Sequence, residues 1–213
     1  MKVLLTGFMP FGKSNINPSY EAVKLVPNEI MGAKIVKREI PVVFRKGGQA
    51  VIDAICKVKP DVVVLVGQAG GRFGINPERV AINVEDCSPS FPDNEGNSPQ
   101  DEAIIADGPA AYFTNLPVKA MVKKMMDNGI PAYISNSAGT YVCNDSMYHM
   151  LHLLYTKFPN VLGGFIHVPY ATVQLNVKAP SMSIEDMAKG LQLSIEAILE
   201  NHKNINATNS TSY

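Results

Sequence analysis

Short runs of β-branched and aliphatic residues alternate along this chain with longer segments in which apolar residues recur every three or four positions. The first pattern is typical of buried strands and the second of amphipathic helices. Strands that alternate with helices pair in parallel, because each helix carries the chain back across one face of the sheet. The sequence therefore predicts the α/β class: a single three-layer α/β/α sandwich with a mostly parallel, twisted sheet.

The bounds of the expected elements follow from these two patterns. Strands are expected at 2–6, 35–43, 61–67, 131–135 and 164–168, with a more polar strand at 79–84. Helices are expected at 17–26, 44–58, 117–129, 144–155 and 183–199. Asn17 and Pro18 open the first helix, as N-cap and as proline at the first helical position. We expect one catalytic domain over 1–200 and a frayed tail over 201–213, which is rich in Asn, Ser and Thr.

The charge balance argues against several classes of protein. Lys and Arg together number 19, as do Asp and Glu, so the formal net charge is zero. Without an overall positive field to attract phosphates or anionic lipids, we expect neither nucleic acid nor membrane as a partner. The apolar run before Thr6 is too short for a secretion signal, and no run of about 18 apolar residues is present. The sequence predicts a cytoplasmic protein.

The three cysteines, Cys56, Cys87 and Cys143, are widely spaced along the chain. An odd number cannot all pair within one chain, and no two of them have the short spacing of a zinc knuckle. We therefore expect neither structural disulfides nor a bound metal. Cys56, on the apolar face of an expected helix, is predicted to be a buried, unreactive residue.

The segment from Gly7 to Ser14 matches the phosphate-loop pattern G-x-x-x-x-G-K-[ST] letter for letter. Such a loop binds phosphate through successive backbone N–H groups at the start of a helix. Here Pro10 lacks an N–H, Phe8 and Phe11 add bulk, and the helix signal comes several residues later. We expect Phe8 and Phe11 to form an apolar pocket wall at the end of the first strand. A nucleotide-binding protein that uses Lys13 remains an alternative function.

A turn of small residues, 137–140, leads from one expected strand into a helix, and Cys143 follows in the first helical turn. Unpaired N–H groups and the helix dipole favour a thiolate at such a position. This placement predicts that Cys143 is a nucleophile.

A cysteine nucleophile needs a base and a group that orients the base. His149 and His152 lie on the same helix, about 9 and 13 Å along its axis from Cys143, too far to reach its sulfur. His202 lies beside the expected tail, whereas His167 stands near the end of the next strand, at the same sheet edge as Cys143. His167 is therefore the predicted base. The residues alone leave four candidates for the orienting group: Glu78, Asp86, Asp93 and Glu95.

Several longer motifs occur in order along nearly the whole chain. They are Leu-Leu-Thr-Gly-Phe-x-Pro-Phe-Gly, Val-Gly-Gln-Ala-Gly-Gly-Arg, Pro-Glu-Arg-Val-Ala-Ile-Asn, Pro-Asp-Asn-Glu-Gly-Asn, Ser-Asn-Ser-Ala-Gly-Thr-Tyr-Val-Cys-Asn and Gly-Phe-Ile-His-Val-Pro-Tyr. Together they resemble the pyroglutamyl-peptidase I family, also called pyrrolidone-carboxylate peptidase. The resemblance implies a cytosolic cysteine exopeptidase, often a homotetramer, that removes an N-terminal pyroglutamyl residue from peptides without a metal or cofactor.

The same resemblance implies roles for individual residues. Cys143 would be the nucleophile, His167 the general base and then acid, and Glu78 the group that orients His167. Phe8 and Phe11 would flank the lactam ring, and Gln68 would lie close to the site.

Two segments depart from the family pattern. Family members commonly have Asp-Ala-Arg-Ile-Pro-Asp where this chain has the longer Asp-Cys-Ser-Pro-Ser-Phe-Pro-Asp from Asp86 to Asp93, without the arginine. After Tyr170 the usual Ile-Pro-Glu-Gln becomes Ala-Thr-Val-Gln. If the missing arginine stabilises the oxyanion, turnover is lower, so a homologue that binds pyroglutamyl peptides with reduced turnover is a second alternative. Cys87, in the altered loop, is expected to be idle rather than a second reactive thiol.

Overall fold

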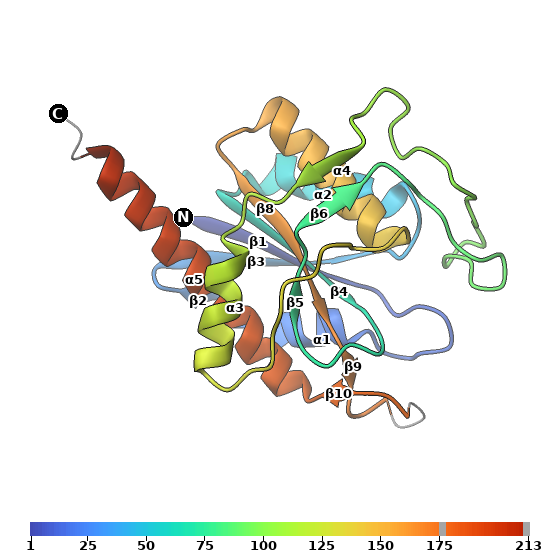
Figure 1. Cartoon of the computed structure of the whole chain (residues 1–213), viewed down its shortest axis with the longest axis horizontal. Coiled ribbons are helices and arrows are strands. Elements are labelled where there is room, and N and C mark those ends of the chain that lie inside the picture. Colours follow the sequence, from blue (N-terminus) through green and yellow to red (C-terminus); the bar gives the residue numbers. More distant parts are fainter. Residues whose placement is uncertain (175–177, 211–213) are drawn as a thin grey trace.

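A six-stranded sheet forms the centre of the molecule, with helices on both of its faces (Figure 1). The structure, a computed structural model, describes residues 1–174 and 178–210. The strands of this sheet are β1 (Lys2–Phe8), β2 (Glu29–Ile30), β3 (Ala33–Ile40), β4 (Val62–Gln68), β5 (Asn76–Pro77) and β8 (Leu162–Val168). Their order is β2-β3-β1-β4-β8-β5; the four central strands are parallel, and the short strands at both edges are antiparallel.

Five helices are present in the described part of the chain: α1 (Pro18–Leu25), α2 (Lys46–Val58), α3 (Val118–Asp127), α4 (Val142–Lys157) and α5 (Ile184–Ser210). Alternate residues of a strand point to opposite faces, and each face has its own core. Val3 and Leu5 of β1 pack in the core that includes α1, α3 and α5. Leu4, between them, packs in the core that includes α2 and α4. The predicted three-layer sandwich with a mostly parallel sheet is confirmed.

Two pairs of short strands lie outside the main sheet. β6 (Val80–Ile82) pairs with β7 (Ala111–Phe113), and β9 (Tyr170–Ala171) pairs with β10 (Ser181–Met182). The prediction of a strand at 131–135 is wrong. These residues form only two isolated bridges, one between Ile75 and Ala132 and one between Glu78 and Ser135. The adjacent β5 has two residues, and Pro131 has no N–H to donate, so a regular ladder does not form there.

The last helix extends past the expected bound of residue 199, since α5 continues to Ser210. A frayed tail over 201–213 stays an expectation, and its residues 211–213 lie outside the described residues. Among the described residues, no helix combines the length and the apolar character needed to cross a membrane.

Candidate active site

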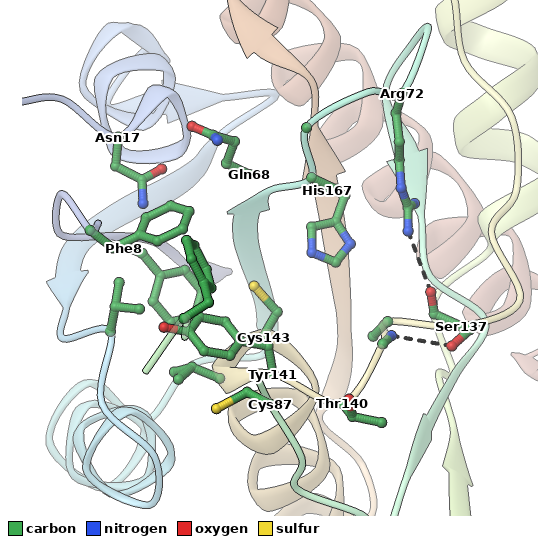
Figure 2. A pocket seen from close by; sticks show the side chains of 18 of the residues that line it. Phe8, Asn17, Gln68, Arg72, Cys87, Ser137, Thr140, Tyr141, Cys143 and His167 are labelled. Atoms are coloured by element: carbon green, nitrogen blue, oxygen red, sulfur yellow. Dashed lines mark hydrogen bonds between the residues drawn. The ribbon is translucent and has the colours of Figure 1, made fainter. Parts of the chain in front are cut away.

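A cavity of about 640 Å³ lies at the carboxyl ends of β1, β4 and β8, the edge at which open α/β sheets commonly bind ligands. Phe8 ends β1, Gln68 ends β4, and His167 is the penultimate residue of β8; all three line the cavity. Cys143 reaches the same cavity from the first turn of α4 (Figure 2). The fold therefore brings together the residues at which the sequence predicts chemistry.

Cys143 owes its position to the start of α4. Tyr141 is the N-cap residue, and its carbonyl oxygen accepts hydrogen bonds from the N–H groups of Asn144 and Asp145, at 2.9 and 3.1 Å. The N–H groups of Val142 and Cys143 precede the first of these bonds and have no partner within the helix.

Burial counters the thiolate that the helix start favours at Cys143. Burial raises the pKa of the thiol to about 12, and the negative charge of Glu78 adds to the effect, while Arg72 lowers the pKa to a smaller extent. A helix start favours an anion by only about 1 kcal/mol, which does not offset this desolvation. The thiol is therefore protonated at neutral pH and needs a base before it can attack.

Gly67 makes room for the sulfur beside His167. The two residues are register partners on β4 and β8, so their side-chain positions lie on the same face of the sheet. A Cβ added to Gly67 would lie 2.9 Å from Cys143 Sγ and 2.7 Å from the ring of Phe165. The thiol thus fills the space next to His167 that any larger residue would occupy, and Figure 2 shows both side chains at the cavity.

Glu78 is the carboxylate that contacts His167. The Nδ1 atom of His167 lies 2.6 Å from Glu78 Oε1, and both side chains are buried. Pairing of β5 with β8 holds Glu78 there, since its N–H donates to the carbonyl of Phe165 at 2.9 Å. With Nδ1 donating to the carboxylate, the Nε2 atom of a neutral imidazole is left as the acceptor.

The other three candidate carboxylates have different partners. Asp86 lines the cavity, and its carboxylate accepts a hydrogen bond from the Asp101 N–H at 3.2 Å. Asp93 accepts hydrogen bonds from backbone N–H groups of its own loop and of Phe44. Glu95 forms an exposed ion pair with Lys46 at 2.7 Å. Of these four carboxylates, Glu78 is the one in contact with His167.

His167 is neutral in the resting site. Burial lowers the pKa of its imidazole, and although Glu78 opposes this, the net direction is downward from 6.5. The site therefore holds a protonated thiol next to a neutral base.

The two histidines further along α4 lie elsewhere, as predicted. His149 packs on Gly48, with Nδ1 3.0 Å from the carbonyl oxygen of Asp145. His152 has Nδ1 2.9 Å from the hydroxyl of Tyr112. Neither is among the residues that line the cavity.

Aromatic side chains form one wall of the cavity. Phe8 and Phe11 both line it, as the sequence predicts, and Phe11 lies 6.1 Å from Phe91 and 6.4 Å from Tyr141 between ring centroids. Sequence reasoning missed Phe91 and Tyr141 as parts of this wall. The signal for Tyr141 was its place two residues before the cysteine; Phe91 lies in the altered loop, where no pattern predicts side-chain direction.

The altered loop is part of the site rather than remote from it. Cys87 lines the cavity, and burial raises the pKa of its thiol, which keeps it protonated. The Thr140 hydroxyl donates to the Asp86 carbonyl at 2.9 Å and so ties the loop to the turn before α4. Cys56, predicted to be buried, is exposed, because Ile55 and Val51 are the residues of α2 that face the core.

Gln68 presents its amide to the cavity in a defined orientation. Its Oε1 accepts a hydrogen bond from Gln174 Nε2 at 3.2 Å, and Gln174 Oε1 accepts one from the Ala171 N–H at 2.8 Å. Because the oxygen of Gln68 is occupied, its NH₂ group is the end available to a ligand. No sequence pattern predicts this contact of Gln174.

The start of α1 does not have the geometry of a phosphate-binding loop. α1 begins only at Pro18, four residues after the pattern ends at Ser14. The side chain of Asn17 accepts the Ser19 N–H at 3.1 Å and so occupies the helix N-terminus that would bind an anion. Lys13 is exposed and does not line the cavity that contains Cys143.

The chain is similar to known proteins over nearly its whole length. A family model described as pyroglutamyl peptidase matches residues 1–201. A pyrrolidone-carboxylate peptidase of Clostridium perfringens is 57% identical over 207 residues, which is 96% of this chain and 96% of that protein. Another, from Thermosipho melanesiensis, is 53% identical over 201 residues, 93% of this chain and 98% of that protein.

Solved structures are similar too. The crystal structure of pyroglutamyl peptidase I from Bacillus amyloliquefaciens has a TM-score of 0.88 at 46% identity, over 92% of this chain and 96% of that chain. A mutant pyrrolidone carboxyl peptidase from Pyrococcus furiosus has a TM-score of 0.89 at 43% identity, over 94% of this chain and 99% of that chain.

Proposed function

The chain belongs to the pyroglutamyl peptidase family, cysteine peptidases that remove N-terminal pyroglutamate, and we propose that the cavity at the sheet edge is where it does so. In this proposal Cys143 is the nucleophile, His167 the general base and then acid, and Glu78 the group that orients His167. The observation that carries it is the hydrogen bond of His167 to buried Glu78, in a site where Cys143 Sγ packs on the register partner of His167.

The reaction begins with a proton transfer, because the thiol is protonated at rest. His167 Nε2 accepts the proton of Cys143 Sγ as the sulfur attacks the scissile carbonyl carbon. The carbonyl oxygen becomes an oxyanion, and the backbone N–H of Cys143 is suited to donate to it. Glu78 stabilises the imidazolium that forms.

Breakdown uses the same proton. The His167 imidazolium gives it to the leaving amine, the C–N bond breaks, and a pyroglutamyl thioester remains on Cys143. Water then attacks the thioester with His167 as base, which releases pyroglutamate and restores the thiol.

Recognition of the lactam follows from the cavity wall. A pyroglutamyl group has no free amine, so it needs apolar surfaces for its ring and hydrogen-bond partners for its amide. We propose that Phe8 and Phe11 flank the ring and that the NH₂ group of Gln68 donates to the lactam carbonyl. Because Phe8 and Phe11 are apolar, a substrate with a charged group at the position of the ring would bind less well.

A comparison of two chromogenic amides tests this function. Prolyl amide has a ring of the same size, but it lacks the lactam carbonyl and carries a charged secondary amine at neutral pH. We expect kcat/KM for the pyroglutamyl amide to exceed that for the prolyl amide by at least about 10³-fold, since a site built to hydrogen-bond a group discriminates strongly against analogues that lack it. Similar values for the two amides, or no hydrolysis of either, would refute the proposed function.

Replacement of Gly67 by alanine tests the placement of the thiol. The new Cβ would displace Cys143 Sγ or the Phe165 ring, and we expect kcat to fall about a hundredfold, with a smaller change in KM, since a misplacement near 1 Å has an effect of this size. Gly163→Ala is the matched control. Gly163 lies on β8, on the same face of the sheet as Gly67, and its new Cβ would lie 2.4 Å from a Leu154 methyl. It should lower thermal stability and leave kcat of the folded enzyme unchanged. Equal losses of kcat in both variants would show that Gly67 has no specific role.

We also propose that the enzyme is a homotetramer and that it acts in the cytoplasm. The support for the tetramer is the family to which the chain belongs. The support for the location is that family together with the lack of a secretion signal in the sequence pattern. Sedimentation equilibrium of the purified protein measures the first, and fractionation of the source cells measures the second.

A further inference from the structure

Glu78 Oε1 has a second donor besides His167. Arg72, from the loop between β4 and β5, places a guanidinium nitrogen 2.7 Å from this oxygen, and its other terminal nitrogen lies 3.4 Å from the carbonyl oxygen of Ser137 (Figure 2). The Arg72 side chain is about one fifth exposed, at 22%, whereas that of Glu78 is fully buried. Among the described residues that line the cavity, Arg72 is the only arginine or lysine.

The charge of Glu78 requires this partner. A carboxylate that is fully buried is costly unless a cation or several donors compensate it. Its second oxygen, Oε2, has no hydrogen-bond partner among the described residues, and His167 is neutral at rest. The guanidinium is therefore the positive charge that stabilises the carboxylate in the resting enzyme.

We propose, on the basis of the function above, that Arg72 is a positioning residue of the catalytic site. By binding the oxygen that His167 also binds, Arg72 supplies a positive charge beside the Glu78 carboxylate and keeps it aimed at the imidazole, so that His167 need not serve as its counter-ion. His167 then remains a neutral base, ready to accept the thiol proton. Without Arg72, the unpaired carboxylate would hold His167 as a resting imidazolium, which cannot act as a base.

This role has a signature in the pH dependence of the reaction. Among the described residues, the charged groups that act on His167 are Glu78 after β5 and Arg72 from the β4–β5 loop. The Cys143 thiol, from α4, lies beside His167 at the cavity (Figure 2). The productive form has a neutral imidazole and a protonated thiol, so kcat/KM falls as the pH falls through the pKa of His167 and again as it rises through that of Cys143. In the wild type the acid limb should lie below pH 6.5, because the pKa of His167 is lowered from that value.

The test compares Arg72→Met and Arg72→Lys with the wild type over the full pH range. Arg72 lowers the pKa values of both His167 and Cys143, so its loss should move both limbs upward. We expect the acid limb of Arg72→Met to move up by about one pH unit. At a pH below this limb, kcat/KM should be roughly tenfold lower than in the wild type, and it should recover as the pH rises. Arg72→Lys keeps the charge and should restore the acid limb to within a few tenths of a unit.

Arg79→Met is the matched control. It removes a positive charge one residue from Glu78, but the Arg79 guanidinium binds Asn136 at 2.8 Å and does not line the cavity. Both limbs should stay in place in this variant. Unchanged limbs in Arg72→Met, with a higher KM alone, would overturn the proposal and assign Arg72 to substrate contact.

A second readout separates this inference from the proposed function. NMR titration of the His167 imidazole, identified by its loss in His167→Gln, measures the pKa without any substrate. A higher value in Arg72→Met than in the wild type supports the role of Arg72 even if the pyroglutamyl amide is not hydrolysed. An equal or lower value would refute it even if that amide is a good substrate.

Discussion

Replacement of Cys143 by alanine is expected to lower kcat/KM for a pyroglutamyl amide by at least about 10⁴-fold, because removal of a nucleophile leaves only the stabilisation that the rest of the site provides. The variant should remain folded, since alanine fills part of the space against Gly67 without adding atoms. It should also still bind pyroglutamyl peptides, because the apolar wall and Gln68 are unchanged. Steady-state kinetics and isothermal titration with a pyroglutamyl peptide measure these two properties.

Cys56→Ala is the control for that variant. Cys56 is exposed on α2 and does not line the cavity, so its loss should leave kcat and KM unchanged. If Cys143→Ala kept wild-type turnover, or if Cys56→Ala lost it, the nucleophile would have been assigned to the wrong residue.

Glu78→Gln is expected to lower kcat by about 10³- to 10⁴-fold while KM changes little, by analogy with the loss of the orienting carboxylate in Ser-His-Asp triads. Glutamine has the shape of glutamate but not its charge, so it cannot stabilise an imidazolium at His167. Its NH₂ group can also bind Nδ1 as a donor, which would put the proton on Nε2 and remove the base. The guanidinium of Arg72 would at the same time lose its ion-pair partner, which lies 2.7 Å away.

The measurements for Glu78→Gln are kcat, KM and the thermal unfolding midpoint. Stability separates a catalytic loss from a folding loss, because Glu78 is buried. Glu95→Gln is the matched control: the same substitution at an exposed residue that pairs with Lys46, which should change neither kcat nor KM. If kcat of Glu78→Gln fell by less than tenfold, Glu78 would not belong to the proposed triad.

The layered fold could be predicted from the sequence because hydrophobic periodicity reports burial, and burial decides which face of each element meets the sheet. The first four helices begin and end within two residues of the expected bounds. The prediction of a strand at 131–135 is wrong because a run of apolar residues shows that a segment is buried but not which strand it pairs with. The neighbour of that segment, β5, is two residues long.

The positions of the proposed catalytic residues were predictable where topology alone decides position. Parallel strands end at one edge, so Cys143 and His167 were expected to meet there, and both line the cavity. Glu78 could not be separated from three other carboxylates by the residues alone, since loop direction is set by packing. The resting charge of Cys143 could not be derived from helix position either, because it depends on how many protein atoms surround the sulfur.

The contacts of Arg72 and Gln174 could not be predicted from the sequence either, because they too depend on the direction of loops. Each acts by binding a side chain far away in the chain or on another loop, namely Glu78 and Gln68. A motif records that a residue is present, whereas the atom that it contacts depends on the fold.

In the proposed mechanism the acyl group of the substrate passes through the Cys143 sulfur at the start of α4. Rapid acid quench of the enzyme during turnover of a pyroglutamyl ester, followed by proteolysis and mass spectrometry, locates that group directly. We expect one pyroglutamyl adduct, attached to Cys143 and absent from Cys143→Ala. An adduct on Cys87 or on a non-cysteine residue, or full turnover with no adduct at any quench time, would contradict it.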